Sequence, residues 1–275
     1  MKHQTFIPVL LLLGCLACQQ DNVEPYASKD NVYFNYKDDE NSLSYTFAYN
    51  PEKTADTLFL PLAIAGNRVV HDRKLKLAIL QEQTTATAGL HFEPLQEYYV
   101  LPADSGKLQV PVILYNTDPE LQQKTVSIAF TTAASEDFDV LFSERNKFTI
   151  EFSNRLERPL WWTLWEDQLA NYSRVKHELY LVVVGNVDLL ASMEGDAYLE
   201  IPRNLYLIDK LRVFLRDPFA WVAQNTQGYI LEERADGGYD FYHTDNPARA
   251  LLLQKNESDG RYYFIDENGQ RVTMF

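Results

Sequence analysis

Apolar and polar residues alternate in short runs between residues 31 and 153, which is the two-residue period of a β-strand with one buried face. One such run places Leu43, Tyr45 and Phe47 on one side and Ser44 and Thr46 on the other. Similar runs predict further strands near residues 32–34, 58–64, 75–79, 98–100, 108–114, 126–130 and 148–152. Because each apolar face needs a second sheet to cover it, the pattern predicts an antiparallel β-sandwich.

The spacing of apolar residues changes after residue 154. Trp161, Trp165 and Leu169 recur at four-residue steps behind Pro159, which predicts one helix over residues 160–171. In such a helix Trp161 and Trp165 would share the buried stripe. Trp162 would point elsewhere, so it is the tryptophan of this segment that we expect to be exposed.

Two more helices and a return to strands are predicted further along. Ser173 suits the cap of a helix that continues through Val183, and a helix over residues 204–225 is expected to break or kink at Pro218. Short strands follow near residues 229–231, 239–242, 251–253 and 262–265. The chain is therefore predicted to be mainly β, with an α+β C-terminal part.

The length of 275 residues suits two compact domains, and an apolar fraction of 46% can fill their cores. We expect the sandwich domain to span residues 31–154 and the small α+β domain residues 155–275. Ahead of them, residues 19–30 contain few bulky apolar groups and are predicted to form a tether.

Residues 1–18 have the layout of a secretory signal: Lys2 precedes an apolar run at residues 6–13, which small residues follow. The segment ends in Cys15 and Cys18, and it resembles a bacterial lipoprotein signal in which such a cysteine is lipidated. We favour Cys18, because the chain turns polar directly after it; Cys15 is the alternative. An ordinary cleaved signal is a further alternative.

A lipid on this cysteine would anchor the chain to the membrane without a transmembrane helix. We expect the protein to lie in the cell envelope, anchored to the outer membrane. Residues 19–21 resemble the short polar signals that send such lipoproteins to the cell surface, and the periplasmic side remains the alternative.

Charge and cysteine content exclude several function classes. The net charge of −14 opposes binding to nucleic acid, because phosphate backbones repel an acidic protein. Cys15 and Cys18 are the only cysteines. The chain that follows Cys18 can therefore have no disulfide, no thiolate nucleophile and no cysteine metal site.

Several stretches resemble the DUF4843 family of Bacteroidota lipoproteins, a domain of unknown function. They are Asn31-Val32-Tyr33-Phe34, residues 57–66, Thr87-Ala88-Gly89-Leu90-His91-Phe92, Leu101-Pro102-Ala103, residues 159–165 and Tyr172-Ser173-Arg174-Val175-Lys176. Genes of this family commonly neighbour outer-membrane receptors and substrate-binding lipoproteins of the SusC and SusD kind. The resemblance thus implies a role in acquiring glycans or other nutrients.

The segment at residues 87–92 also resembles the corresponding turn of the Calx-beta sandwich, which implies an Ig-like fold for the N-terminal half. Acidic loops of that sandwich can hold calcium. Asp118 and Glu120 occupy a similar late loop here, and Glu136, Asp137 and Asp139 form the densest acidic group. Solvated loop acids are the commoner explanation of such groups, so we assign no metal site and no cofactor.

No catalytic motif is present, and we assign no catalytic residue. The histidines after the signal are dispersed at positions 71, 91, 177 and 243. Flat aromatic rings can stack on sugars, and Trp162 and Trp221 are the candidate ligand-binding residues.

We therefore expect a non-enzymatic accessory or binding component of a SusC/SusD-like glycan uptake system. Its partners would be the membrane, an outer-membrane receptor complex and a glycan. Two alternatives remain open at this point: a hydrolase acting on glycans or peptides with a site assembled from dispersed residues, and a structural partner of an outer-membrane complex.

Overall fold

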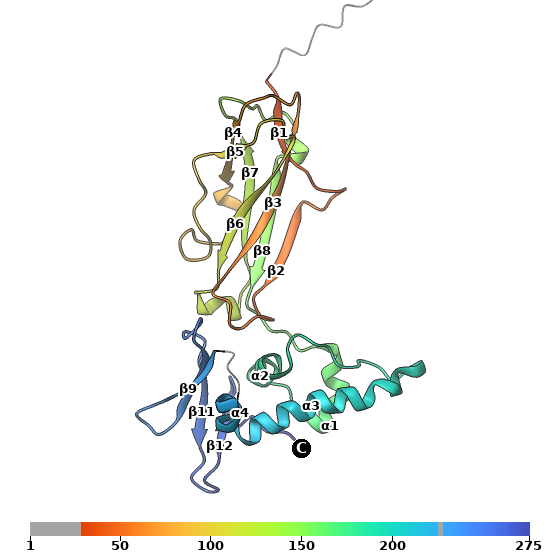
Figure 1. Ribbon diagram of the computed structural model, residues 1–275, viewed down its shortest axis with the longest axis vertical. Helices are drawn as coiled ribbons and strands as arrows, with labels where there is room; N and C mark the ends of the chain where they lie inside the picture. Colours follow the sequence, from red (N-terminus) through yellow and green to blue (C-terminus); the bar gives the residue numbers. More distant parts are fainter. Residues whose placement is uncertain (1–28, 225–227) are drawn as a thin grey trace, which may run out of the picture.

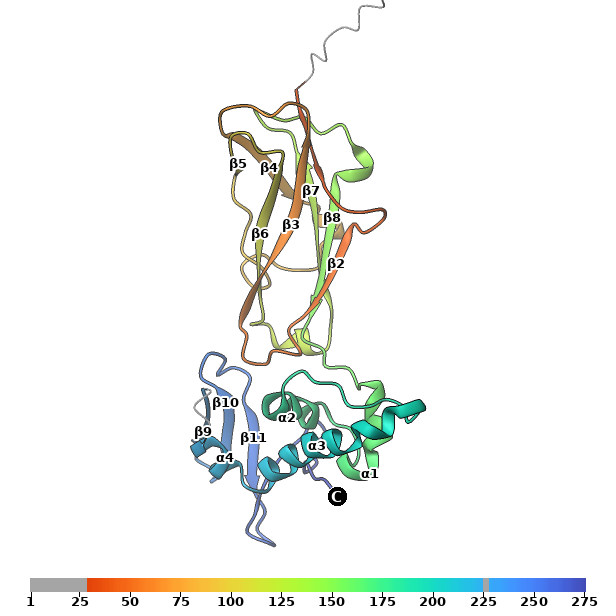
Figure 2. The same ribbon diagram turned by 45° about the vertical axis from the view of Figure 1, so that its right-hand side comes forward.

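The computed structural model describes residues 29–224 and 228–275. The predicted signal, Cys15, Cys18 and the tether up to residue 28 lie outside the described residues. Figures 1 and 2 show two bodies stacked along the long axis, with a strand-rich half at the top and a mixed half below it. No helix in the two described ranges is both long enough and apolar enough to cross a membrane.

The upper half is a β-sandwich, as predicted. One sheet has the order β1-β3-β6, formed by Asn31–Phe34, Ala55–Ala65 and Lys107–Tyr115. The other has the order β2-β8-β7-β4-β5, formed by Ser42–Thr46, Lys147–Ser153, Val126–Ala133, Arg73–Ile79 and Tyr99–Leu101. Short 3₁₀ turns η1 to η3 cover Gln81–Gln83, Pro119–Gln122 and Ser143–Arg145. The fold class inferred from the period-two pattern is confirmed.

The edge strand β2 departs from the predicted antiparallel arrangement, because it runs parallel to β8. The chain leaves the first sheet after Phe34 and reaches the second sheet at Ser42 without a hairpin. It continues down the molecule, and β8 runs the same way toward the lower half (Figure 1). Because the two strands run in the same direction, they pair in parallel.

Side-chain alternation fills the space between the two sheets. In β8, Phe148, Ile150 and Phe152 point inward, and the residues between them are more exposed. The core they join also contains Val32, Phe34, Phe47, Leu60, Leu77, Val110, Val112, Leu114, Ile128, Phe130 and Phe138. The sandwich core is thus made by the inward faces of both sheets.

The lower half begins with a different geometry from the predicted single helix. Residues Leu160–Trp165 form the 3₁₀ segment η4, and the helix α1 covers only Glu166–Leu169. A 3₁₀ segment has three residues per turn, so Trp162 and Trp165, which are three positions apart, lie on the same side. Trp162 is therefore buried together with Trp165, and Trp161 is buried as well.

The other helices follow the sequence pattern more closely. Helix α2 covers Arg174–Val184, and the Ser173 hydroxyl caps it by accepting a hydrogen bond from the backbone N–H of Lys176. After the 3₁₀ segment η5 at Gly195–Glu200, helix α3 covers Ile201–Arg216. Pro218 then begins a separate helix, α4, at Pro218–Gln224, so the predicted break is present.

An antiparallel sheet of order β12-β11-β10-β9 completes the lower half. Its strands are Tyr229–Glu233, Tyr239–His243, Leu251–Lys255 and Tyr262–Phe264 for β9 to β12. Leu179, Tyr180, Ile208, Leu211, Phe214, Phe241, Leu253 and Phe264 lie in a second core between the helices and this sheet. Ala48, from the β2–β3 loop of the sandwich, is buried in the same core, so the two halves are in contact.

Buried polar side chains hold this contact. The turn between β10 and β11 reaches the sandwich, where the Asn246 amide donates to the Pro51 carbonyl at 2.9 Å. In the same turn the guanidinium of Arg249 donates from Nε to Glu178 Oε1 and from Nη1 to Asn154 Oδ1, both at 2.7 Å. Glu178 belongs to α2 and Asn154 follows β8, so one side chain binds both halves.

Asn154 continues these contacts into the sandwich. Its amide donates to Asn116 Oδ1 at 2.9 Å, and the Asn116 amide donates to the Lys53 carbonyl at 2.9 Å. We call Asn116, Asn154, Glu178, Asn246 and Arg249 the junction network. All five are buried.

Aromatic rings enclose His177 on the other face of α2. Its neighbours are the rings of Trp161, Trp162, Tyr172 and Tyr180, with centroids 5.7 to 6.5 Å from the imidazole. Nδ1 has no hydrogen-bond partner among the described residues, and the ring hydrogen-bonds the backbone of Glu157. Burial lowers the pKa of His177 to about 4, and the opposing effects of Asp188 and Glu157 do not offset it.

The buried pair in the junction network gives a first prediction. Arg249→Met would leave the Glu178 carboxylate, whose side chain is 2% exposed, with Arg174 at 3.3 Å as its remaining ion-pair partner. We expect a loss of about 3–5 kcal/mol in the free energy of unfolding, because removing one partner of a buried ion pair leaves the other charge poorly compensated. Urea titration followed by tryptophan fluorescence measures it, since every tryptophan lies in the lower half.

The double variant Glu178→Met/Arg249→Met is the control, because it removes both charges of the pair. We expect it to lose much less than the two single variants added together. A double variant as unstable as that sum would show that the pair does not act as a unit.

The enclosed imidazole gives a second prediction, on pH. Between pH 6.5 and about 4 the unfolded chain protonates His177 and the folded chain does not, so stability must fall as the pH falls. The shift corresponds to about 3 kcal/mol, fully lost near pH 4. We expect His177→Phe to remove this part of the pH dependence in urea titrations. The exposed His71→Phe variant should keep the wild-type profile.

Candidate functional site: a polar groove at the edge of the sandwich

The tryptophans named from the sequence do not form an exposed platform. Trp162 was expected to be exposed, and this is wrong: it is 0% exposed. Its ring stacks on Trp161 at 5.4 Å, and its indole N–H donates to the Ala170 carbonyl at 3.1 Å. The 3₁₀ geometry of η4 is the physical reason, and in this conformation the ring offers no face to a ligand.

Trp221, the second candidate, is half-buried on α4. It packs edge-on against Phe214 at 4.9 Å and against Tyr229 at 6.2 Å. Its contacts in this structure therefore belong to the second core.

Three of the acidic residues singled out from the sequence, Glu136, Asp137 and Asp118, have side-chain partners within the protein. Glu136 pairs with the Lys74 ammonium at 3.1 Å, and Asp137 accepts the Lys74 backbone N–H at 2.7 Å. Asp118 caps η2 and hydrogen-bonds His91 at 2.8 Å, and these contacts lower the pKa of its carboxyl. Within residues 29–224 and 228–275, no three histidine, aspartate or glutamate side chains are grouped so that they could hold a metal ion.

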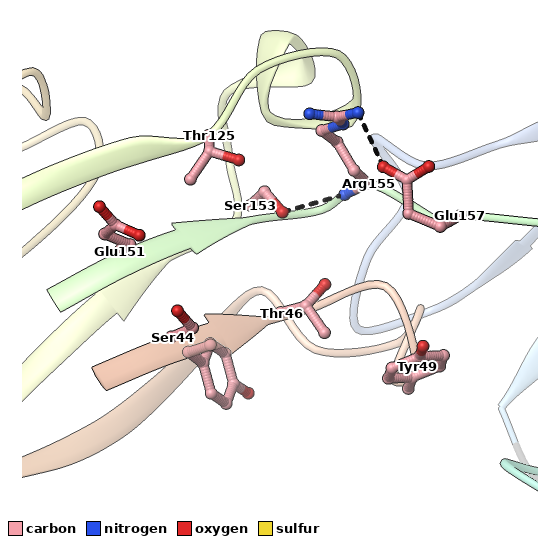
Figure 3. A pocket seen from close by; sticks show the side chains of 9 residues that line it. Ser44, Thr46, Tyr49, Thr125, Glu151, Ser153, Arg155 and Glu157 are labelled. Atoms are coloured by element: carbon pink, nitrogen blue, oxygen red, sulfur yellow. Dashed lines mark hydrogen bonds and ion pairs between the residues drawn. The ribbon is translucent and has the colours of Figure 1, made fainter. Parts of the chain in front are cut away.

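A groove of about 360 Å³ lies at the lower end of the sandwich, where β2 and β8 form the sheet edge. Figure 3 shows its polar side chains standing around one hollow. They come from β2, the β2–β3 loop, the start of β7, β8 and the segment after it: Ser44, Tyr45, Thr46, Tyr49, Thr125, Glu151, Ser153, Arg155 and Glu157. We call this surface the edge groove.

The parallel pairing of β2 with β8 builds the floor of the edge groove. The register sets Ser44 beside Glu151 and Thr46 beside Ser153. Since side chains alternate across a strand and Phe152 points into the core, these four side chains share the outer face. Two hydroxyls from one strand thus lie next to a hydroxyl and a carboxylate from the other.

Arg155 and Glu157 form the polar wall of the edge groove. Arg155 Nη2 lies 2.7 Å from Glu157 Oε1, and its backbone N–H donates to the Ser153 hydroxyl at 3.4 Å. Both side chains are well exposed, so the pair adds little to stability. The pair provides hydrogen-bond donors and acceptors beside Ser153, and Figure 3 shows both contacts.

Tyr49 is the exposed aromatic residue of the edge groove, with 43% of its surface accessible. The two residues before it are fully buried, Phe47 in the sandwich core and Ala48 in the second core. The backbone N–H of Asn50 donates to the Phe47 carbonyl at 3.0 Å. Tyr49 is therefore an exposed ring on a loop that both cores hold in place.

Tyr45 anchors the groove from below. Its hydroxyl donates to Asp56, which also accepts from the Lys53 ammonium at 2.8 Å. Burial raises the pKa of Tyr45, and the hydrogen bond to Asp56 raises it further. Burial acts to raise the pKa of Asp56 as well, but the hydrogen bonds from Lys53 and Tyr45 outweigh it and lower this pKa. Tyr45 thus stays neutral and Asp56 charged at neutral pH.

A second and larger hollow of about 600 Å³ begins on the far side of Tyr49. It lies between the β2–β3 loop and the lower half, and Glu52, Lys210, Tyr229 and His243 help to line it. Tyr49 lines both hollows. We call this second space the junction hollow.

From the sequence, Trp162 and Trp221 are the candidate rings, and no motif marks the edge groove. The alternation does place Ser44 and Thr46 on the polar side of their strand. The sequence does not reveal that β2 pairs with β8, and this pairing sets those hydroxyls beside Glu151. Strand pairing between residues a hundred positions apart leaves no local signal.

Comparison with solved structures gives distant likenesses to the fold alone. The apo-form Calx CBD1 domain is 11% identical, with a TM-score of 0.34, over 46% of this chain and 97% of its own. A Bacteroides ovatus ATCC 8483 protein proposed to bind carbohydrate is 13% identical, with a TM-score of 0.34. A two-domain Bacteroides fragilis NCTC 9343 protein of unknown function is 16% identical, with a TM-score of 0.32. The matches span 46% of this chain in both cases, and 38% and 45% of those proteins.

No curated protein matches the chain. A family model does: residues 26–186 match the domain of unknown function DUF4843. The matched part includes the whole sandwich, the tryptophan segment and α2, and it is more than half of the 275 residues. The chain therefore belongs to the DUF4843 family.

Proposed function

We propose that this protein is a non-enzymatic, lipid-anchored carbohydrate-binding protein of the cell envelope, and that the edge groove is its binding surface. The observation that carries the proposal is the exposed ring of Tyr49 beside an ordered set of hydroxyl, carboxylate and guanidinium groups. Sugars present apolar ring faces and hydroxyl edges, and a site for them needs both kinds of partner.

The charges of the edge groove favour a neutral sugar. Its ionisable groups are Glu151, Glu157 and Arg155, and Arg155 is already paired with Glu157. The Glu151 carboxylate would repel an anionic ligand and accept hydrogen bonds from hydroxyl groups. The junction hollow beyond Tyr49 offers room for further units of a longer glycan.

The place of the groove suits a tethered binding protein. The described chain begins at Lys29, at the end of the sandwich opposite the lower half, and the edge groove lies beside the lower half (Figures 1 and 2). A lipid on Cys18 would therefore leave the groove pointing away from the membrane. Such an arrangement supports the role of an accessory component in a SusC/SusD-like uptake system, which the family resemblance implies.

The proposal predicts that Tyr49→Ala weakens glycan binding about ten-fold or more, because the stacking face is lost. A glycan array with the full chain identifies a neutral ligand, and isothermal titration calorimetry measures its affinity. Tyr98→Ala is a matched control, since Tyr98 is 42% exposed and lies outside the groove. An equal loss in both variants, or no loss in Tyr49→Ala, would contradict the proposal, and turnover of the bound glycan would favour a hydrolase.

The anchor gives a separate prediction. We expect Cys18→Ala to accumulate as unprocessed precursor in the membrane fraction, as wild type should after treatment with globomycin. The Cys15→Ala variant is the control and should mature normally. The opposite pattern would place the lipid on Cys15, and normal processing of both variants would indicate an ordinary cleaved signal.

A further inference from the structure

A further hollow lies in the lower half, and its lining is positively charged although the chain as a whole is negative. It measures about 390 Å³ and lies between the last turn of α3 and strand β12. Arg212 and Arg216 enter it from α3, and Arg261, Tyr262 and Tyr263 from β12 and the turn before it. We call it the arginine hollow. None of its lining residues belongs to the edge groove or the junction hollow.

Helix geometry explains why two of these arginines meet. Arg212 and Arg216 are four residues apart on α3, so their side chains lie one above the other on one face. Arg216 lies in the last turn of the helix, where the macrodipole favours cations, and Arg212 lies one turn before it. This preference explains their presence on the helix, but it does not explain why cations from a second element meet them.

The cations of the arginine hollow are under-neutralised. Arg212 pairs with Asp209 at 3.0 Å. Arg216 and Arg261 have no ion pair with any carboxylate among the described residues. The charge of Arg261 does help to lower the pKa of the Asp259 carboxyl. Arg271 adds a fourth guanidinium nearby, 5.4 Å from the centre of the Tyr263 ring. In a chain with 39 acidic and 25 basic residues, it is unexpected that four guanidinium groups lie close together and that, within the part of the chain that the structure describes, Arg212 alone among them has an ion pair.

The aromatic rings beside these arginines are held in place. The Tyr263 hydroxyl donates to Asp259 at 2.9 Å. Tyr262 packs edge-on against Phe219 at 5.1 Å and against Tyr239 at 5.6 Å. The hollow thus combines fixed apolar ring surface with charged forks that can each give two parallel hydrogen bonds to an oxyanion.

From this arrangement we infer that the arginine hollow is a second binding site, which takes a small ring compound bearing a carboxylate, sulfate or phosphate group. Arg216 and Arg261 bind the oxyanion, and the tyrosine rings contact the body of the ligand. The ligand is small because the net charge of −14 repels a long polyanion from the molecule as a whole. The inference stands apart from the edge groove, whose carboxylates favour a neutral ligand.

The test measures binding of defined probes to the full chain by isothermal titration calorimetry at low and high salt. The probes are glucuronate, glucose 6-sulfate and glucose 6-phosphate. Glucose is the control for binding of the ring alone, and inorganic sulfate is the control for binding of the anion alone. We expect at least one charged sugar to bind, to bind more tightly than glucose or inorganic sulfate, and to weaken as salt rises. No binding by any charged sugar would overturn the inference.

Variants locate the binding. Arg216→Gln and Arg261→Gln are each expected to weaken it about ten-fold or more, through loss of a charge-assisted hydrogen bond. Arg203→Gln is the matched control: Arg203 is an exposed arginine in the first turn of α3, paired with Glu200 at 3.5 Å and outside the hollow. A similar loss in Arg203→Gln, or none in the two hollow variants, would overturn the assignment. Tyr49→Ala should leave this binding unchanged, so failure of one site is distinguishable from failure of the other.

Discussion

The arrangement of the two halves depends on the buried guanidinium of Arg249. Its contacts with Glu178 of α2 and Asn154 after β8 join elements more than seventy residues away from it along the chain. A buried charge is tolerated when its partners are in place, so separating the halves would take the Asn154 acceptor away from Arg249 and leave Asn154 without its guanidinium donor. The apolar contact around Ala48 brings the halves together, and the junction network specifies their orientation.

This orientation fixes the position of the β2–β3 loop, which carries Tyr49. The β2–β3 loop contributes Ala48 to the second core and the Pro51 carbonyl to Asn246, and Tyr49 lies between these two attachments. Because the loop is fixed at both ends, its backbone would not have to be ordered when Tyr49 binds a ligand. The edge groove is therefore a consequence of domain docking as well as of strand pairing, although most of its lining residues belong to the sandwich.

The parts of this structure that the sequence predicts are those decided by local chemistry. The alternation in β8, the Ser173 cap and the break at Pro218 each depend on a few adjacent residues, and all three are present. The burial of Trp162 and the parallel pairing of β2 depend on tertiary context, and both differ from expectation. Arg249 carried no signal at all, because an arginine in a polar turn is usually solvated and only the docked sandwich makes it buried.

The net charge of the chain likewise does not predict the charge of each local surface. A value of −14 opposes the approach of polyanions, because the field at long range is repulsive. At contact distance the nearest groups determine the preference for a ligand. Salt screens the interaction with charges more than about 8–10 Å away. The edge groove holds Glu151 beside hydroxyl groups, and the arginine hollow holds Arg216 and Arg261 beside tyrosines. One acidic chain can therefore carry two surfaces of opposite preference, and the fold rather than the composition decides which residues meet on each.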